Sequence, residues 1–95
     1  MLIDAHFHVW QLARGDYGWL DASANPALST ICRDMTVADW QAQAGPLGVT
    51  GSVLVQAAPT ESETQFLLEQ ATSSLAVRGV VGWVDWLAPA VVARV

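Results

Sequence analysis

The stretch LIDAHFHVW, residues 2–10, decides the fold. Its side chains fall into two alternating sets, which are Ile3, Ala5, Phe7 and Val9 on one side and Leu2, Asp4, His6, His8 and Trp10 on the other. A period of two is typical of a β-strand, in which residues two apart point to the same face. The pattern therefore predicts a first strand over 2–10 whose two imidazoles project together.

Turn-forming residues fill the segment that follows this strand. Gly, Asp, Ser, Asn and Pro recur over 11–32, and neither a strand period nor a helix period is visible there. We expect a long loop. A loop of this length in a small domain is typical of a lid or wall over a functional site.

Two capping boxes predict the starts of helices further along the chain. Thr36 with Asp39 predicts a short helix that stops near Gly45-Pro46, because proline cannot continue it. Thr60 with Glu63 predicts a second helix, which apolar residues at helical spacing support.

Strand signals alternate with these helices. Residues 51–57 predict a buried parallel strand, residues 77–86 return to β-branched and aromatic types, and Pro89 is placed to open a third helix. This order is that of an α/β fold with a parallel sheet. Three strands do not close such a sheet, so we expect the chain to be one truncated domain over 1–95.

Composition excludes several classes of function. The 95 residues carry a net charge of −5, with four Arg and no Lys, which argues against nucleic acid and against a basic membrane-surface role. The single cysteine cannot form an internal disulfide, and we find neither an export signal nor an apolar stretch long enough to span a membrane. We therefore expect a cytoplasmic protein.

His6 and His8 are the only histidines of the sequence. Two imidazoles on one face of a strand need hydrogen-bond partners or a metal, because an unsatisfied buried polar group costs about 1–3 kcal/mol. A shared divalent ion is one solution. Ordinary core or rim histidines hydrogen-bonded to the backbone are the other, and the spacing by itself does not choose between them.

Several stretches, taken in order, resemble one protein family. Residues 3–10 resemble the first strand of the amidohydrolase superfamily, whose metal site begins with H-x-H in a (β/α)₈ barrel. Further similarity lies in Arg14-Gly15-Asp16-Tyr17, Trp19-Leu20, and residues 53–59 and 79–85. Together they resemble the branch that holds sugar-acid lactonases and the pyrone-dicarboxylate hydrolase.

This resemblance implies a fold and a reaction. The chain would be the amino-terminal three βα units of a TIM barrel, which needs about 250 residues when complete. It would belong to a hydrolase that opens a lactone ring, with a divalent ion, expected to be zinc, held partly by His6 and His8. That ion would polarise the carbonyl and lower the pKa of bound water. In relatives that work without a metal, the same histidines would bind substrate.

The resemblance also implies partners and further site residues. The partner would be a small-molecule carboxylate or sugar lactone, and a homo-oligomer is compatible with the family. No residue here matches the family's later histidines or its catalytic Asp, so we assign no catalytic residue. Gln56, Asp85 and Trp10 are candidates for substrate binding at the rim of the barrel.

Each of these candidates has a structural alternative. Gln56 would otherwise cap the loop after its strand, and Asp85 would cap the helix near Pro89. Four aromatic residues would either wall a pocket for a sugar-like ring or belong to the core, namely Trp10, Tyr17, Trp19 and Trp83. Asp4 would either orient one imidazole or pair with a distant arginine.

Two functional alternatives belong to other classes. The chain would then be a catalytically inactive truncated fragment that acts only as an association or regulatory module, with exposed sheet edges that demand a partner. The other alternative is a sugar-acid binding protein that has kept the pocket and has no catalytic activity.

Overall fold

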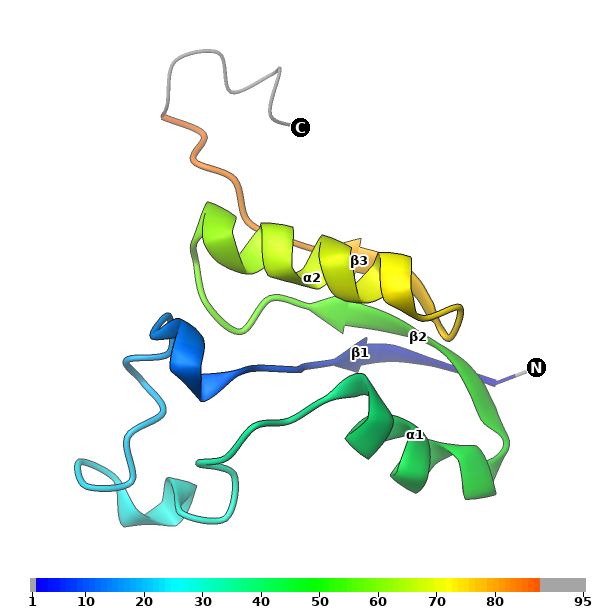
Figure 1. Ribbon diagram of the computed structural model, residues 1–95, viewed down its shortest axis with the longest axis horizontal. Coiled ribbons are helices and arrows are strands. Elements are labelled where there is room, and N and C mark those ends of the chain that lie inside the picture. Colours follow the sequence, from blue (N-terminus) through cyan, green and yellow to red (C-terminus); the bar gives the residue numbers. More distant parts are fainter. Residues whose placement is uncertain (1, 88–95) are drawn as a thin grey trace.

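The computed structural model describes residues 2–87, and the helix expected near Pro89 lies outside them. Strands and helices alternate as β1 (Leu2–Phe7), α1 (Val37–Ala44), β2 (Val49–Val55), α2 (Glu61–Ser73) and β3 (Val77–Val81). Short 3₁₀ helices lie at Leu12–Arg14, Pro26–Leu28 and Gly45–Leu47. The strands are parallel in the order β1-β2-β3 (Figure 1), which confirms the predicted α/β fold with a parallel sheet.

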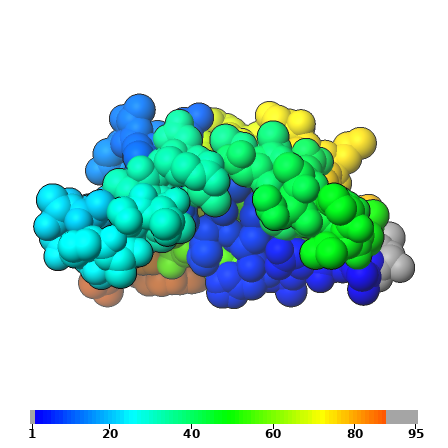
Figure 2. All heavy atoms as spheres, turned by 90° about the horizontal axis from the view of Figure 1, so that it is seen from below, coloured from blue at the N-terminus to red at the C-terminus, as the bar shows by residue number. Residues whose placement is uncertain are grey.

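The two helices pack against one face of the sheet. One buried cluster joins side chains of all three strands with side chains of α1 and α2, namely Phe7, Val9, Val37, Leu54, Phe66, Leu67 and Val77. The opposite face is open, and Ile3 and Val81 on it are 44% and 53% exposed. Figure 2 shows the atoms of β1 in blue, uncovered, with α1 in green on their other side.

A bulge in β1 changes which residues share a face. Asp4 pairs with Ser52 and Phe7 pairs with Leu54, so three residues of β1 span two residues of β2. Because the alternation slips by one residue, Asp4 faces the helices as Phe7 does, while His6 and His8 face the open side. The expected grouping of Asp4 with the two histidines is therefore wrong.

The amino ends of the helices differ in how far they follow the sequence pattern. At α1, Thr36 accepts the Asp39 N–H and the Asp39 carboxylate accepts the Thr36 N–H, so the predicted capping box is confirmed. At α2, Thr60 caps the Glu63 N–H, but the Glu63 carboxylate turns into the protein. Only half of the second capping box forms.

All three strands end earlier than their sequence pattern predicts, and β2 runs over Val49–Val55 instead of 51–57. β1 stops at Phe7, and Trp10 forms an isolated antiparallel bridge with Met35 instead. β3 stops at Val81, because Thr64 of α2 accepts the Trp83 N–H at 2.8 Å and donates to the Trp83 carbonyl at 2.6 Å. These contacts use the backbone groups that a longer strand would offer to its neighbour.

The long loop after β1 is confirmed and has a core of its own. Trp10, Tyr17, Leu20 and Ala58 are buried together, and partly buried apolar side chains of the loop surround them. Within residues 2–87, no helix is long and apolar enough to cross a membrane.

Candidate metal centre

His6 and His8 meet at the carboxyl end of β1, on the face of the sheet that the helices leave open. Both residues are exposed. Their ring centroids are 5.0 Å apart with an interplanar angle of 78°, and the two Nε2 atoms are 3.3 Å apart. The structure thus places the two predicted ligands side by side.

A backbone carbonyl fixes the tautomer of His8. The His8 Nδ1 atom lies 2.8 Å from the Val55 carbonyl oxygen at the end of β2. A carbonyl oxygen can only accept a hydrogen bond, so Nδ1 carries the proton and Nε2 of the neutral ring keeps its lone pair. This backbone bond agrees with one of the two alternatives left open above, and under the other alternative Nε2 would be the nitrogen that binds a metal.

The separation of the two nitrogens fits a shared ion. Zinc lies about 2.0–2.1 Å from imidazole nitrogens in tetrahedral sites, and two such ligands are then about 3.3–3.4 Å apart. The observed Nε2 to Nε2 distance of 3.3 Å falls in that range. Among residues 2–87, no group of three or more His, Cys, Asp or Glu side chains is arranged to hold a metal.

Asp4 does not contact the imidazole of either histidine through its hydrogen bonds. Its Oδ2 atom accepts the indole N–H of Trp40 on α1 at 2.9 Å, and its Oδ1 atom accepts the backbone N–H of His6 at 3.1 Å. Asp4 therefore braces the backbone next to the bulge from the side of the helices.

Gln56 directly follows the carbonyl that holds His8. Its backbone N–H donates to the Val81 carbonyl at 2.9 Å and continues the pairing of β2 with β3. Its side-chain Oε1 atom is buried and has no hydrogen-bond partner among the described residues. A buried acceptor without a donor is costly, so this atom is ready to accept a hydrogen bond from a bound group.

Asp85 and Trp10 each make a hydrogen bond to a backbone group. The Asp85 carboxylate accepts the Leu87 N–H at 3.0 Å, which closes a turn just before the end of the described residues. Trp10 is only 7% exposed, and its indole N–H donates to the Arg33 carbonyl at 2.7 Å. The position of Trp10 supports the alternative that places it in the core.

A buried carboxylate in the first turn of α2 was not expected from the sequence. Glu63 is fully buried, and its Oε1 atom accepts from Arg14 at 2.8 Å and from Tyr17 at 2.7 Å. Its Oε2 atom accepts the Ala57 N–H at 2.8 Å. The sequence showed Glu63 only as a helix cap, because nothing in a local pattern reveals that a loop far along the chain supplies the ion-pair partner.

This network joins the long loop to the start of α2. Arg14 also pairs with Asp16 at 2.9 Å, and its guanidinium stacks over Phe66 at 4.5 Å from the ring centroid. Burial and the hydrogen bond to the Glu63 carboxylate raise the pKa of Tyr17 well above its ordinary value of 10.0. Tyr17 therefore stays a neutral donor and holds the loop in place.

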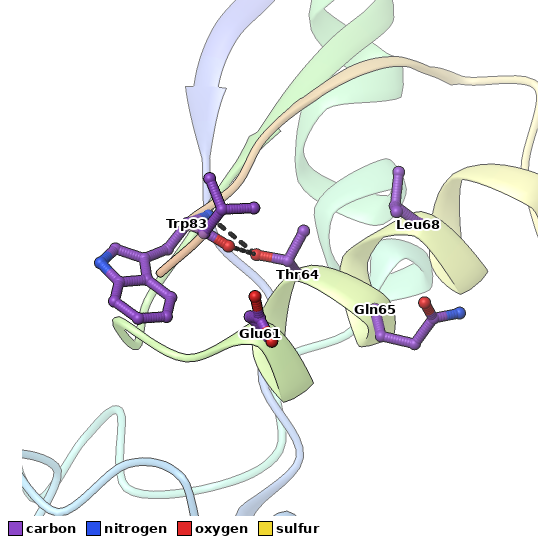
Figure 3. A pocket seen from close by; sticks show the side chains of 6 residues that line it. Glu61, Thr64, Gln65, Leu68 and Trp83 are labelled. Carbon is purple, nitrogen blue, oxygen red and sulfur yellow. Dashed lines mark hydrogen bonds between the residues drawn. The ribbon is translucent and has the colours of Figure 1, made fainter. Parts of the chain in front are cut away.

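Two cavities lie beside these elements. One of about 300 Å³ opens next to His8 and is lined also by Arg33, Thr36 and Trp40. The other, of about 210 Å³, lies where Trp83 approaches α2, and Figure 3 shows Trp83 bonded to Thr64 at its edge. Only the first of the two includes a predicted site residue.

Comparisons with known proteins agree on one kind of enzyme. No family model matches the chain. Two curated relatives are named L-fucono-1,5-lactonase. The protein from Burkholderia ambifaria is 40% identical over 83 residues, covering 87% of this chain and 27% of its own length. The protein from Burkholderia multivorans is 38% identical over 93 residues, covering 98% and 30%.

Two crystal structures of an amidohydrolase also match the chain. A crystal structure of an amidohydrolase from Burkholderia multivorans with bound zinc superposes with a TM-score of 0.85 at 32% identity, over 99% of this chain and 32% of that protein. A second crystal form, with bound HEPES, gives the same TM-score and identity. The chain thus spans about 30% of the length of these relatives.

Proposed function

The chain belongs to the amidohydrolase superfamily, and from this premise we propose that it is part of a hydrolase that opens a sugar-acid lactone. Water adds to the ester carbonyl, the bond between the carbonyl carbon and the ring oxygen breaks, and the ring oxygen leaves as a hydroxyl. The product is the open hydroxy acid. The names of both lactonase relatives support this substrate class.

We also propose that residues 1–95 form the first three βα units of a (β/α)₈ barrel. In such a barrel the helices cover the outside, and the active site lies at the carboxyl ends of the strands. The described sheet has α1 and α2 on one face. His6 and His8 project from the other face at the carboxyl end of β1, which is where this fold carries its chemistry.

His6 and His8 would hold a divalent ion, which we propose to be zinc. The observation that carries this proposal is the 3.3 Å separation of the Nε2 atoms, together with the Val55 carbonyl that keeps the His8 proton on Nδ1 and off Nε2. Such an ion acts as a Lewis acid on a carbonyl and makes water a better nucleophile at neutral pH. The bound zinc of a solved relative supports the choice of metal.

The chain's own residues have defined tasks in this proposal. Gln56 would accept a hydrogen bond from a substrate hydroxyl through its unpartnered Oε1 atom. Asp85, which closes a turn through its bond to the Leu87 N–H, would bind substrate at the rim of the barrel. The long loop would form a wall of the site, held by the bond from Arg14 to Glu63.

A variant of the complete gene product tests this function. The double variant His6→Ala/His8→Ala should lose most of its bound zinc and most of its turnover of L-fucono-1,5-lactone, measured by acid release. Gln41→Ala, an exposed change on α1, serves as the matched control and should keep both. Normal turnover in the double variant would refute the assignment.

A catalytically inactive association module is the second candidate. The exposed apolar side chains of the open face, such as Ile3 and Val81, favour it because such surfaces usually bind a partner. Light scattering and lactone turnover on the same sample distinguish the two functions. A stable assembly without turnover of any lactone would support the second.

A further inference from the structure

We propose that the exposed indole face of Trp19 contacts the substrate and packs against the C–H face of the sugar lactone ring. This inference rests on the proposed lactonase function and adds a specific binding residue to it. The ligand class is an uncharged sugar ring with one apolar face.

Trp19 lies on the same side of the chain as the two histidines. Phe7 and Val9 pack into the core under the helices, so His8 and Trp10 point to the other side of the extended backbone. Trp10 belongs to the second cluster, and its ring meets the Trp19 ring edge to face at 5.5 Å and 86°. Along this side the order is therefore His6, His8, Trp10, and then Trp19 against Trp10.

The Trp19 indole and the His8 ring are held by carbonyls at the end of β2 and just after it. The Trp19 N–H donates to the Ala57 carbonyl at 2.8 Å, and the His8 ring binds the Val55 carbonyl at the same distance. Two residues of chain span at most about 7 Å. The Trp19 indole and the His8 ring are thus held by carbonyls only two residues apart in the chain.

The Trp19 ring keeps a large free surface despite these contacts. The residue is 46% exposed. Its only hydrogen-bonding atom is already used by Ala57, so the exposed part is the apolar ring system. A ring fixed by a hydrogen bond and an edge contact loses little conformational freedom when a ligand packs on it, which favours binding.

The support of Trp19 is itself rigid. The Ala57 peptide that accepts the indole bond donates its own N–H to Glu63, which is fully buried. Tyr17, two residues before Trp19, also bonds to Glu63. The two oxygens of the Glu63 carboxylate therefore hold the peptide that binds the Trp19 indole and the nearby loop residue Tyr17.

Charge on the loop does not compete with this apolar contact. Arg14 is the nearest cation in sequence, and its guanidinium is held by Glu63 and Asp16 and stacked on Phe66. It is not free to draw a carboxylate to the loop. Trp19 therefore recognises the apolar face of the ring by packing, without help from a charge on the loop.

Steady-state kinetics with L-fucono-1,5-lactone on the complete gene product tests the proposal. Trp19→Ala should raise KM by about tenfold and change kcat by less than about threefold, as expected for a contact made equally in ground and transition states. Trp19→Phe keeps a ring and should recover most of the affinity. Leu75→Ala removes an exposed apolar side chain at the opposite edge of the sheet and should leave both constants unchanged.

A binding measurement covers the case in which Trp19→Ala does not fold. The protein is labelled with 5-fluorotryptophan, and the Trp19 resonance is assigned as the one missing from Trp19→Phe. Adding the open-chain hydroxy acid, or the lactone, should shift that resonance. An unshifted Trp19 signal under saturating ligand, or an unchanged KM in Trp19→Ala, overturns the inference while lactone turnover by the unaltered protein still supports the proposed function. Absence of lactone turnover together with a shifted Trp19 signal would support Trp19 as a ligand contact and would contradict the proposed hydrolase function.

Discussion

The Nε2 atoms of His6 and His8 lie 3.3 Å apart on the open face of a parallel sheet. Asp4, two residues before the pair, and Phe7, which lies between the two histidines, both face the helices because of the bulge between Asp4 and Phe7. Two imidazoles therefore stand side by side at a strand end, and the Val55 carbonyl holds the second ring.

Removing either imidazole should weaken metal binding. His6→Ala and His8→Ala each delete one of two converging nitrogens, and the loss of zinc affinity should be at least about tenfold, since changing even an outer-shell partner costs about 10–100-fold. Calorimetric titration of zinc into the purified protein measures it. Gln41→Ala is again the control, and equal affinity in all three variants would mean that the pair is not a ligand.

The single tyrosine should resist ionisation until the protein unfolds. Burial first, and then the hydrogen bond and the charge of Glu63, raise the pKa of Tyr17 above its ordinary value of 10.0. Ultraviolet absorbance near 295 nm should show no tyrosinate in the native protein at pH 10, whereas the chain in guanidinium should be about half ionised there. Because Tyr17 is the only tyrosine of the sequence, the signal needs no deconvolution.

The same pKa shift makes a prediction about stability. A raised pKa in the folded state contributes stability that is fully present below the unfolded value near 10 and is lost as the pH rises toward the folded value. The free energy of unfolding should therefore fall above about pH 10. Tyr17→Phe should remove this part of the fall, and an identical pH profile in the variant would contradict the network.

Breaking the buried ion pair should cost far more than breaking an exposed one. Glu63→Ala leaves the Arg14 guanidinium and the Ala57 N–H without their acceptor in a buried setting, and we expect a loss of about 3–5 kcal/mol in the free energy of unfolding. Arg33→Ala breaks the pair with Asp39, which lies at 3.7 Å between half-exposed side chains, and should leave the unfolding midpoint nearly unchanged. Urea denaturation of both variants measures the difference, and equal midpoints would show that the Glu63 network carries no stability.

A glycine after β3 should not accept a side chain. A Cβ atom on Gly82 would lie 2.7 Å from Thr64 Cγ2, so Gly82→Ala must displace the residue that bonds the Trp83 backbone. The expected destabilisation is about 1–3 kcal/mol. Gly18→Ala, where the added Cβ meets nothing within 4 Å, is the matched control. A thermal midpoint for Gly82→Ala equal to that of Gly18→Ala would show that the Thr64 side chain moves away from the added Cβ atom without cost.

Local patterns were sufficient for much of the architecture. The alternation in residues 2–10 placed both histidines on one side of an extended chain, and the structure keeps them there. The pair of Thr36 and Asp39 announced α1, because a capping box is made within four consecutive residues. Turn residues over 11–32 predicted the long loop for the same reason, since turn chemistry acts over a few neighbours.

Other features depended on partners far along the chain. Asp4 changed sides because β1 had to match the register of β2, some fifty residues away. Glu63 turned inward because Arg14 and Tyr17 of the loop met it there, and β3 ended at Val81 because Thr64 took the next backbone groups. The sequence by itself determined periods, caps and turns, whose energies are local. Only the tertiary structure decided strand register, the buried charge pair and the aim of each side chain, because these follow from which distant groups can satisfy one another once water is excluded.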